Sequence, residues 1–204
     1  MPRLFPQENV IACLATVAIG AIWVSAASDF GPAGVLERFE QVAPKVIFSV
    51  DKVVYVVDIQ NVIHVTNGFE RYNGKIHDHV PKLRELLEGL AARGLSPKAV
   101  VIIPSPLDSR APCPGWASTE DWTSWPAFIL NGRETPRGQD QTGEIEWYQA
   151  PFDWPVWILF SSGTTGKPKP IVHRAGGMLL QALKEFVICA DIKEDDVFFY
   201  YTTT

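Results

Sequence analysis

The chain has 204 residues, of which 47% are hydrophobic, so it can bury the core of one domain or of part of a larger one. Its 23 acidic and 18 basic residues give a net charge of −5 without any basic cluster, which argues against nucleic acid as a partner. The spacing of Cys13, Cys113 and Cys189 fits neither a zinc site nor a disulfide framework. We therefore expect reduced cysteines and a cytoplasmic location.

An uncharged apolar segment lies near the N-terminus, from Val10 to Ala27. Such a segment is also typical of a signal peptide or a membrane anchor, and a secreted or anchored protein is the alternative interpretation. Gly20 divides the segment into a first part rich in Ala and a second part with the bulky apolar residues Ile22, Trp23 and Val24. We expect a buried helix over Val10–Ile19, a buried strand over Ile22–Ala26 and no stable membrane insertion.

The following segments alternate between strand and helix patterns. Ser28 or Asp29 is available to cap a helix that has Pro32 in its first turn. The predicted elements are a helix over Gly34–Val42, a strand over Lys45–Val50, a helix from Val80 to near Gly94 and a strand over Ala99–Pro104. This alternation predicts an α/β fold with right-handed crossovers and a mainly parallel sheet flanked by helices.

The segment 104–155 is rich in Pro, Gly and Trp, and we expect an irregular excursion with a short helix around Glu120–Leu130. Its tryptophans suggest packing rather than a stacking platform, because few basic residues lie between them. They are Trp116, Trp122, Trp125, Trp147 and Trp154. Further on, a helix is predicted from Gly176-Gly177 to Ile188 and a strand over Val197–Tyr201.

A loop of hydroxyls, glycines and lysines follows the apolar run Val156–Phe160. Glycines allow positive φ and expose backbone N–H groups, hydroxyls donate hydrogen bonds, and lysines supply positive charge. This combination predicts an anion site, with phosphate as the natural guest. The candidate residues are Ser161, Ser162, Gly163, Thr164, Thr165, Gly166, Lys167 and Lys169.

The spacing of this loop excludes the Walker phosphate loop, which needs four residues between its glycines and then Lys-Ser or Lys-Thr. Here two residues separate Gly163 from Gly166, and Pro168 follows Lys167. A polar hairpin turn between two strands is the alternative, because the extended pattern resumes at 169–173.

The twelve residues Ile158–Lys169 resemble the AMP-binding motif of adenylate-forming enzymes at every position. The resemblance implies that the loop wraps the β- and γ-phosphates of ATP, with Lys169 as the closing cation. Lys167 stands at a variable position of the motif and is a weaker candidate. His173 is expected to be a packed strand residue rather than a general base, because a lone histidine is seldom catalytic.

Other stretches are similar to one branch of that family, the acetoacetyl-CoA synthetases. They are Ala21–Trp23, Ser28–Gly31, Gly34–Phe39, Pro44–Val50, Val172-His173 and Gly176-Gly177. The resemblance implies that acetoacetate attacks the α-phosphate of ATP and that CoA then displaces AMP, with Mg²⁺ bridging the phosphates. Another short-chain acyl-CoA synthetase and a non-catalytic nucleotide-binding remnant are the alternatives.

The family pattern extends beyond this chain. Residues 1–204 would be an incomplete part of the large N-terminal domain, without the adenine motifs, the C-terminal lid domain and its catalytic lysine. We therefore expect a fragment that is inactive alone. In the family pattern Lys52–Tyr55 continues directly into Asn73–Lys75, so Val56–Tyr72 is expected to be a retained intron or a true insertion. A hairpin with an Asn67-Gly68 turn would suit an insertion.

Overall fold

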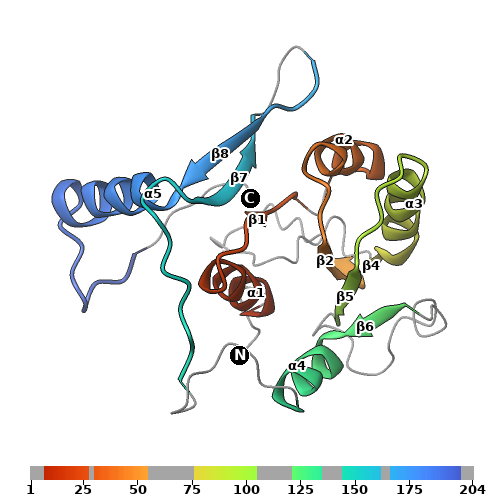
Figure 1. Ribbon diagram of the computed structural model, residues 1–204, viewed down its shortest axis with the longest axis horizontal. Coiled ribbons are helices and arrows are strands. Elements are labelled where there is room, and N and C mark those ends of the chain that lie inside the picture. The colour runs from red at the N-terminus through yellow and green to blue at the C-terminus, as the bar shows by residue number, and fades with distance from the viewer. Residues whose placement is uncertain are drawn as a thin grey trace, which may run out of the picture.

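The computed structural model describes residues 7–27, 30–54, 76–104, 121–134, 144–161 and 166–198, which have a mixed α/β arrangement (Figure 1). The N-terminal half of the chain contains α1 (Gln7–Ala18), β1 (Trp23–Val24), α2 (Pro32–Val42), β2 (Val46–Val50), β3 (Lys52–Val54), β4 (Ile76–Asp78) and α3 (Val80–Ala91). The elements that follow are β5 (Ala99–Ile103), β6 (Trp122–Ser124), α4 (Trp125–Glu134), β7 (Pro155–Phe160), β8 (Pro170–Arg174), α5 (Ala175–Ala182) and the π-helix η1 (Leu183–Cys189).

The described strands form three small sheets, in the orders β1-β7-β8, β2-β5-β6 and β3-β4. The pairs β1–β7, β2–β5 and β5–β6 are parallel, whereas β3–β4 and β7–β8 are antiparallel. The α/β prediction is therefore confirmed. The described strands differ from the expected single, mainly parallel sheet in that they form three sheets and include two antiparallel pairs.

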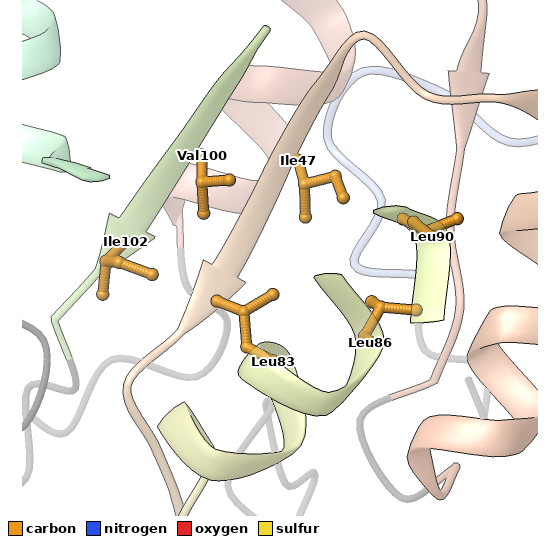
Figure 2. Close-up of a cluster of buried hydrophobic side chains, with 6 residues drawn as sticks. All are labelled: Ile47, Leu83, Leu86, Leu90, Val100 and Ile102. Atoms are coloured by element: carbon orange, nitrogen blue, oxygen red, sulfur yellow. The ribbon is translucent and has the colours of Figure 1, made fainter. Parts of the chain in front are cut away.

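The core lies where α3 covers one face of the β2–β5–β6 sheet. Figure 2 shows the side chains of both elements pointing toward one another. The cluster consists of Ile47 from β2, Val100 and Ile102 from β5, and Leu83, Leu86 and Leu90 from α3. Residues two apart on a strand share a face, as do residues three and four apart on a helix, so the sequence periodicity builds this core directly. Leu90 and Ile102 are fully buried.

Helix α2 packs beside α3 (Figure 1). The two helices approach closely at Gly89, where an added Cβ would lie 2.6 Å from the Leu36 side chain. Pro32 lies in the first turn of α2, as predicted, but the N-cap residue is Gly31 and no side chain caps the helix. Ser28 and Asp29, the predicted caps, lie outside the described residues.

The C-terminal helix matches the predicted extent, with a change of winding. Regular α5 continues directly into the π-helix η1 at Leu183. Near its start, Gly176 is buried, and an added Cβ would collide with the Phe152 ring. A glycine is therefore required there by close packing.

Two other expectations are wrong in detail. The short helix predicted around Glu120–Leu130 is α4, which begins at Trp125 after an unpredicted strand, β6. Val197 and Phe198 are not in a strand, and Val197 is 97% exposed. A strand needs a neighbouring strand for its backbone hydrogen bonds, and none among the described residues pairs with Val197 or Phe198. The remainder of that predicted strand lies outside the described residues.

The apolar N-terminal segment divides at Gly20, as predicted, where φ is 74°. The expected burial of its helix is wrong, because only Ala12 of α1 is buried and Leu14 is 65% exposed. Helix α1 has 12 residues, which corresponds to about 18 Å, against the roughly 30 Å of a bilayer core. In the described ranges, no helix has both the length and the apolar character that a membrane span requires.

Candidate phosphate-binding site

The candidate loop joins the two strands of a hairpin. Strand β7 ends at Phe160, directly before Ser161, and Phe160 pairs with Pro170 at the start of β8. On its other side β7 pairs with β1, so the loop extends from the central strand of a three-stranded sheet. The hairpin interpretation is therefore confirmed as topology. It is compatible with an anion site, because a loop between two paired strands has both of its ends held in place.

Two hydrogen bonds close the ends of this loop. The Ser161 backbone N–H donates to the Lys169 carbonyl oxygen at 3.1 Å. The Lys169 backbone N–H donates to Ser161 Oγ at 3.3 Å. The Ser161 hydroxyl acts as an acceptor here and keeps its own hydrogen to donate to an anion.

Four of the eight candidate residues fall within the described ranges: Ser161, Gly166, Lys167 and Lys169. Gly166 has φ 124°, a backbone conformation that side-chain-bearing residues rarely adopt. An added Cβ would find open space there, so the backbone angle, not crowding, requires glycine. The other four candidates lie outside the described residues: Ser162, Gly163, Thr164 and Thr165.

The two lysines of the loop have different surroundings. Lys167 Nζ lies 3.2 Å from Glu40 Oε1, on α2. Lys169 is exposed, and it has no ion pair in the part of the chain that the structure describes. Lys169 is thus the cation with an uncommitted ammonium group, whereas Lys167 already has an anionic partner.

Helix α2 holds the C-terminal arm of the loop, residues 166–169. Gln41 Nε2 donates to the Pro168 carbonyl oxygen at 2.9 Å, and Pro168 is buried. The Arg38 guanidinium lies 4.2 Å from the centre of the Phe30 ring and 5.8 Å from that of Phe160, at the end of β7. The helix therefore contacts both the strand before the loop and the arm after it.

Glu40 joins two cations from different parts of the chain. Its Oε1 accepts from Lys167, and its Oε2 accepts from Arg93 Nε at 2.6 Å. Its side chain is only 19% exposed, and the hydrogen bond from Lys167, followed by that from Arg93, lowers the pKa of the Glu40 carboxyl. Glu40 is therefore a carboxylate at neutral pH.

Sequence reasoning missed Glu40 and Gln41 because nothing local distinguishes them. On an amphipathic helix both look like ordinary solvated side chains. Their partners Lys167 and Pro168 are 127 residues away in the sequence. Only the fold brings these groups together.

His173, Trp125 and Trp154 pack against other parts of the chain, whereas Trp147 is 60% exposed, contrary to the packing role expected for it. His173 is half-buried in β8 opposite Trp157, consistent with the packed strand residue expected. Trp154 Nε1 donates to the Gly20 carbonyl oxygen at 3.0 Å, and Trp125 packs edge-on against Phe48. Trp116 lies outside the described residues. Within the described ranges there is also no group of three or more His, Cys, Asp and Glu residues that could hold a metal ion.

Comparison with known proteins identifies the protein family to which the chain belongs. The family described as AMP-binding enzyme matches residues 7–203, so the chain belongs to the AMP-binding enzyme family. This confirms the family assignment from the loop motif.

The individual relatives that we compared with the chain are all acetoacetyl-CoA synthetases. The chain is 42% identical over 197 residues to the acetoacetyl-CoA synthetase of Gallus gallus, covering 96% of this chain and 25% of that protein. It is 38% identical over 203 residues to the acetoacetyl-coenzyme A synthetase of Rhizobium meliloti (strain 1021), covering 100% of this chain and 26% of that protein. The solved acetoacetyl-CoA synthetase from Streptomyces lividans superposes with a TM-score of 0.69 at 37% identity, over 98% of this chain and 25% of that chain. The chain thus spans about a quarter of the length of the relatives it matches.

Proposed function

We propose that the chain carries the triphosphate-binding part of an ATP-dependent acid–CoA ligase. The observation that carries this proposal is the β7–β8 hairpin, which presents the family's loop with its ends closed by Ser161 and Lys169. Membership of the AMP-binding enzyme family supports ATP as the nucleotide. The chain's own contribution is to bind and orient the β- and γ-phosphates.

The acid in this proposal is acetoacetate. Its support is that relatives similar over nearly all of this chain are acetoacetyl-CoA synthetases. In the first step a carboxylate oxygen of acetoacetate bonds to the α-phosphorus of ATP while the bond to the β-phosphate oxygen breaks, releasing pyrophosphate. In the second step the CoA thiolate bonds to the acyl carbon and AMP leaves.

The residue roles follow from what each group can donate. The Ser161 hydroxyl, the Gly166 backbone N–H and the Lys169 ammonium would contact phosphate oxygens, with Ser162–Thr165 completing the loop. Positive charge held against the pyrophosphate would stabilise the charge that develops as this group leaves. Mg²⁺ would be held mainly by the phosphates of ATP and by water, as is usual for Mg²⁺ bound to a nucleotide.

Two further points belong to the same proposal. We place the protein in the cytoplasm, supported by the unpaired thiols of Cys13 and Cys189. We also propose that these 204 residues alone do not complete the two-step reaction, supported by the chain spanning about a quarter of its relatives. Acetoacetate-dependent pyrophosphate release by the purified chain would contradict this second point.

Calorimetric titration of the purified chain with Mg·ATP and with AMP tests the phosphate site. ATP should bind more tightly than AMP, because only ATP has β- and γ-phosphates. Lys169→Gln should weaken ATP binding by about tenfold or more, since a charge-assisted hydrogen bond contributes about 1.5–3 kcal/mol. Lys193→Gln removes the same charge from an exposed lysine paired with Asp191 and should leave ATP binding unchanged. Equal binding of ATP and AMP, or equal effects of the two variants, would reject the proposal.

A further inference from the structure

Two consecutive residues of α2 hold two consecutive residues of the loop arm. Glu40 accepts a hydrogen bond from Lys167 Nζ at 3.2 Å, and Gln41 donates one to the Pro168 carbonyl oxygen at 2.9 Å. The first contact is an ion pair and the second fixes the backbone. Together they define where the arm leaves the hairpin toward Lys169.

Glu40 is itself fixed from the opposite side. Arg93 follows α3, which packs on α2, and its Nε lies 2.6 Å from Glu40 Oε2. Arg93 Nη1 also donates to the Gly89 carbonyl oxygen at 2.8 Å, which ties the guanidinium to α3. One oxygen of the Glu40 carboxylate therefore binds Arg93 beside α3, and the other binds Lys167 of the loop.

From this arrangement we propose that Lys167 is a positioning residue that anchors the loop arm to α2 through Glu40, and that it does not bind phosphate. The inference rests on the proposed function, because it divides the labour between the two lysines of the same site. Lys167 holds the arm, and Lys169 offers its charge to the nucleotide.

The electrostatics favour this division. If Lys167 turned to a phosphate, Glu40 would lose one of its two partners while a polyanion entered nearby. With Lys167 retained by Glu40, its ammonium group stays at α2, and Lys169 is the loop lysine whose ammonium group is free to reach the nucleotide. The pair is solvent-exposed on the lysine side, where Lys167 is 72% exposed, so its effect is expected to be modest.

Variants of Lys167 and Glu40 in the full chain show whether Lys167 anchors the loop arm or binds phosphate. The effect of Glu40→Gln on ATP binding has a different direction in the two cases. An anchor predicts that Lys167→Gln and Glu40→Gln each weaken ATP binding about two- to fivefold, the range that an exposed ion pair supports. The double variant should be no weaker than either single one, because both remove the same contact. Lys167→Arg keeps the pair and should bind ATP like the unmodified chain.

A phosphate ligand predicts a different pattern. Lys167→Gln would then weaken ATP binding about tenfold, whereas Glu40→Gln would leave it unchanged or tighten it by releasing the lysine. That result would overturn the inference. Glu37→Gln, on an exposed position one turn earlier in α2, is the matched control and should have no effect.

A second readout needs no nucleotide. The Lys169 backbone N–H is bonded to Ser161 Oγ, so its hydrogen exchange, followed by NMR, reports the closure of the arm. We expect exchange about two- to fivefold faster in Lys167→Gln and Glu40→Gln, and unchanged in Glu37→Gln. Unchanged exchange in all three would overturn the anchor even if ATP binds. If the unmodified chain did not bind ATP, the proposed function would be rejected. The hydrogen exchange of the Lys169 N–H would still test whether Lys167 anchors the arm.

A separate observation concerns the segment Val56–Tyr72. Strands β3 and β4 pair antiparallel in a continuous register, with Lys52 opposite Asp78 and Val54 opposite Ile76. If Val56–Tyr72 were absent, only Tyr55, Asn73, Gly74 and Lys75 would join Val54 to Ile76, with Asn73-Gly74 at the centre of this short connection. Asn-Gly is the preferred two-residue sequence for a type I′ hairpin turn.

We infer that Val56–Tyr72 is an insertion at the tip of the β3–β4 hairpin and that the fold does not need it. The hairpin is joined to the core without this segment. The His79 backbone N–H donates to the Asp51 carbonyl oxygen at 2.9 Å, and Asp78 Oδ1 accepts from the Val80 N–H at the start of α3. The flanking strands are therefore positioned by α3 as well as by their own pairing.

Deletion of residues 56–72 from the full chain tests this inference. The shortened chain should keep the β3–β4 cross-strand contacts in NMR spectra and have an equal or higher Tm. Deletion of residues 57–73 is a matched control of the same length that leaves Val56-Gly74 at the turn. Valine disfavours the positive φ of this turn, so the control should have a lower Tm by several degrees. The inference would be overturned if the chain without residues 56–72 did not fold. It would also be overturned if the chain without residues 57–73 had a Tm equal to or higher than that of the chain without residues 56–72.

Discussion

The sheet β2–β5–β6 with α2 and α3 differs sharply from the hairpin β7–β8 with α5 and η1. The first region contains the buried apolar cluster, in which Leu90 and Ile102 are fully buried. The second region exposes most of its large apolar side chains. They include Ile171, Val172, Leu179, Leu180, Leu183, Phe186, Val187 and Ile188.

This difference shows how the phosphate loop is positioned. The hairpin that bears the loop has little buried core of its own among the described residues, so apolar burial contributes little to its placement. Polar contacts from α2, a helix of the well-packed region, reach the loop arm instead. In the proposed function, the packed region would hold the loop arm in place, and the hairpin would supply the groups that bind phosphate.

The largest expected effect comes from shortening a side chain in the buried core. Ile102→Ala should lower the free energy of unfolding by about 2–5 kcal/mol, because it removes fully buried atoms and leaves a cavity. Ile188→Ala makes the same chemical change in η1, where the side chain is 77% exposed, and should change stability by no more than about 0.5 kcal/mol. Urea unfolding of both variants measures the contrast, and similar losses would remove the basis for distinguishing the regions.

A smaller effect is expected where the hairpin meets α5. Gly176→Ala should destabilise the chain by about 1–2 kcal/mol, because its Cβ would collide with the Phe152 ring. Gly177→Ala adds the same atom one position later, where nothing lies within 4 Å, and should be neutral or stabilise by up to about 1 kcal/mol. Thermal unfolding compares the two variants. Equal shifts in Tm would show that the Gly176 contact does not hold this junction together.

The smallest expected effect is a pH dependence at the link between the two regions. Because Lys167 and Arg93 lower the pKa of the Glu40 carboxyl, its contribution to stability is fully present above the pKa of an unfolded glutamate. This contribution is lost as the pH falls through the lower pKa of the folded state. A carbon-13 NMR titration of the Glu40 carboxyl should give a midpoint below the usual value of about 4.3.

The matched comparison for that titration is Lys167→Gln. Removal of the larger cause should raise the pKa of Glu40 toward its ordinary value, with the influence of Arg93 remaining. An unchanged midpoint in this variant would show that the ion pair is not formed in solution.

The sequence best predicts features that arise from a periodic apolar pattern or from a run of consecutive residues. Helix α3 and strand β5 follow from helical and extended apolar patterns, and the loop follows from nine consecutive residues, Ser161–Lys169. Strand β6 has only three residues, too few to show a period. The pairing of β1 with β7 and the contacts of Glu40 and Gln41 join distant segments, so no local pattern indicates them.

The proposed bounds of the insertion, Val56 and Tyr72, rest on the sequence pattern together with the pairing of β3 and β4. The sequence alone indicates that Val56–Tyr72 interrupts a family pattern, and the β3–β4 register adds the prediction that Asn73-Gly74 closes the gap. Sequencing of the transcript across Tyr55–Asn73 distinguishes the two origins. A message that retains the coding bases for this segment would exclude an intron.

The central claim is that the β7–β8 loop binds the outer phosphates of ATP. Phosphorus-31 NMR of Mg·ATP during addition of the chain tests it most directly, because each phosphate has its own resonance. The account predicts that the β- and γ-phosphate resonances shift and broaden more than the α-phosphate resonance, and that Lys169→Gln reduces this effect. A perturbation confined to the α-phosphate, or none at all at chain concentrations that exceed the ATP concentration, would contradict the account.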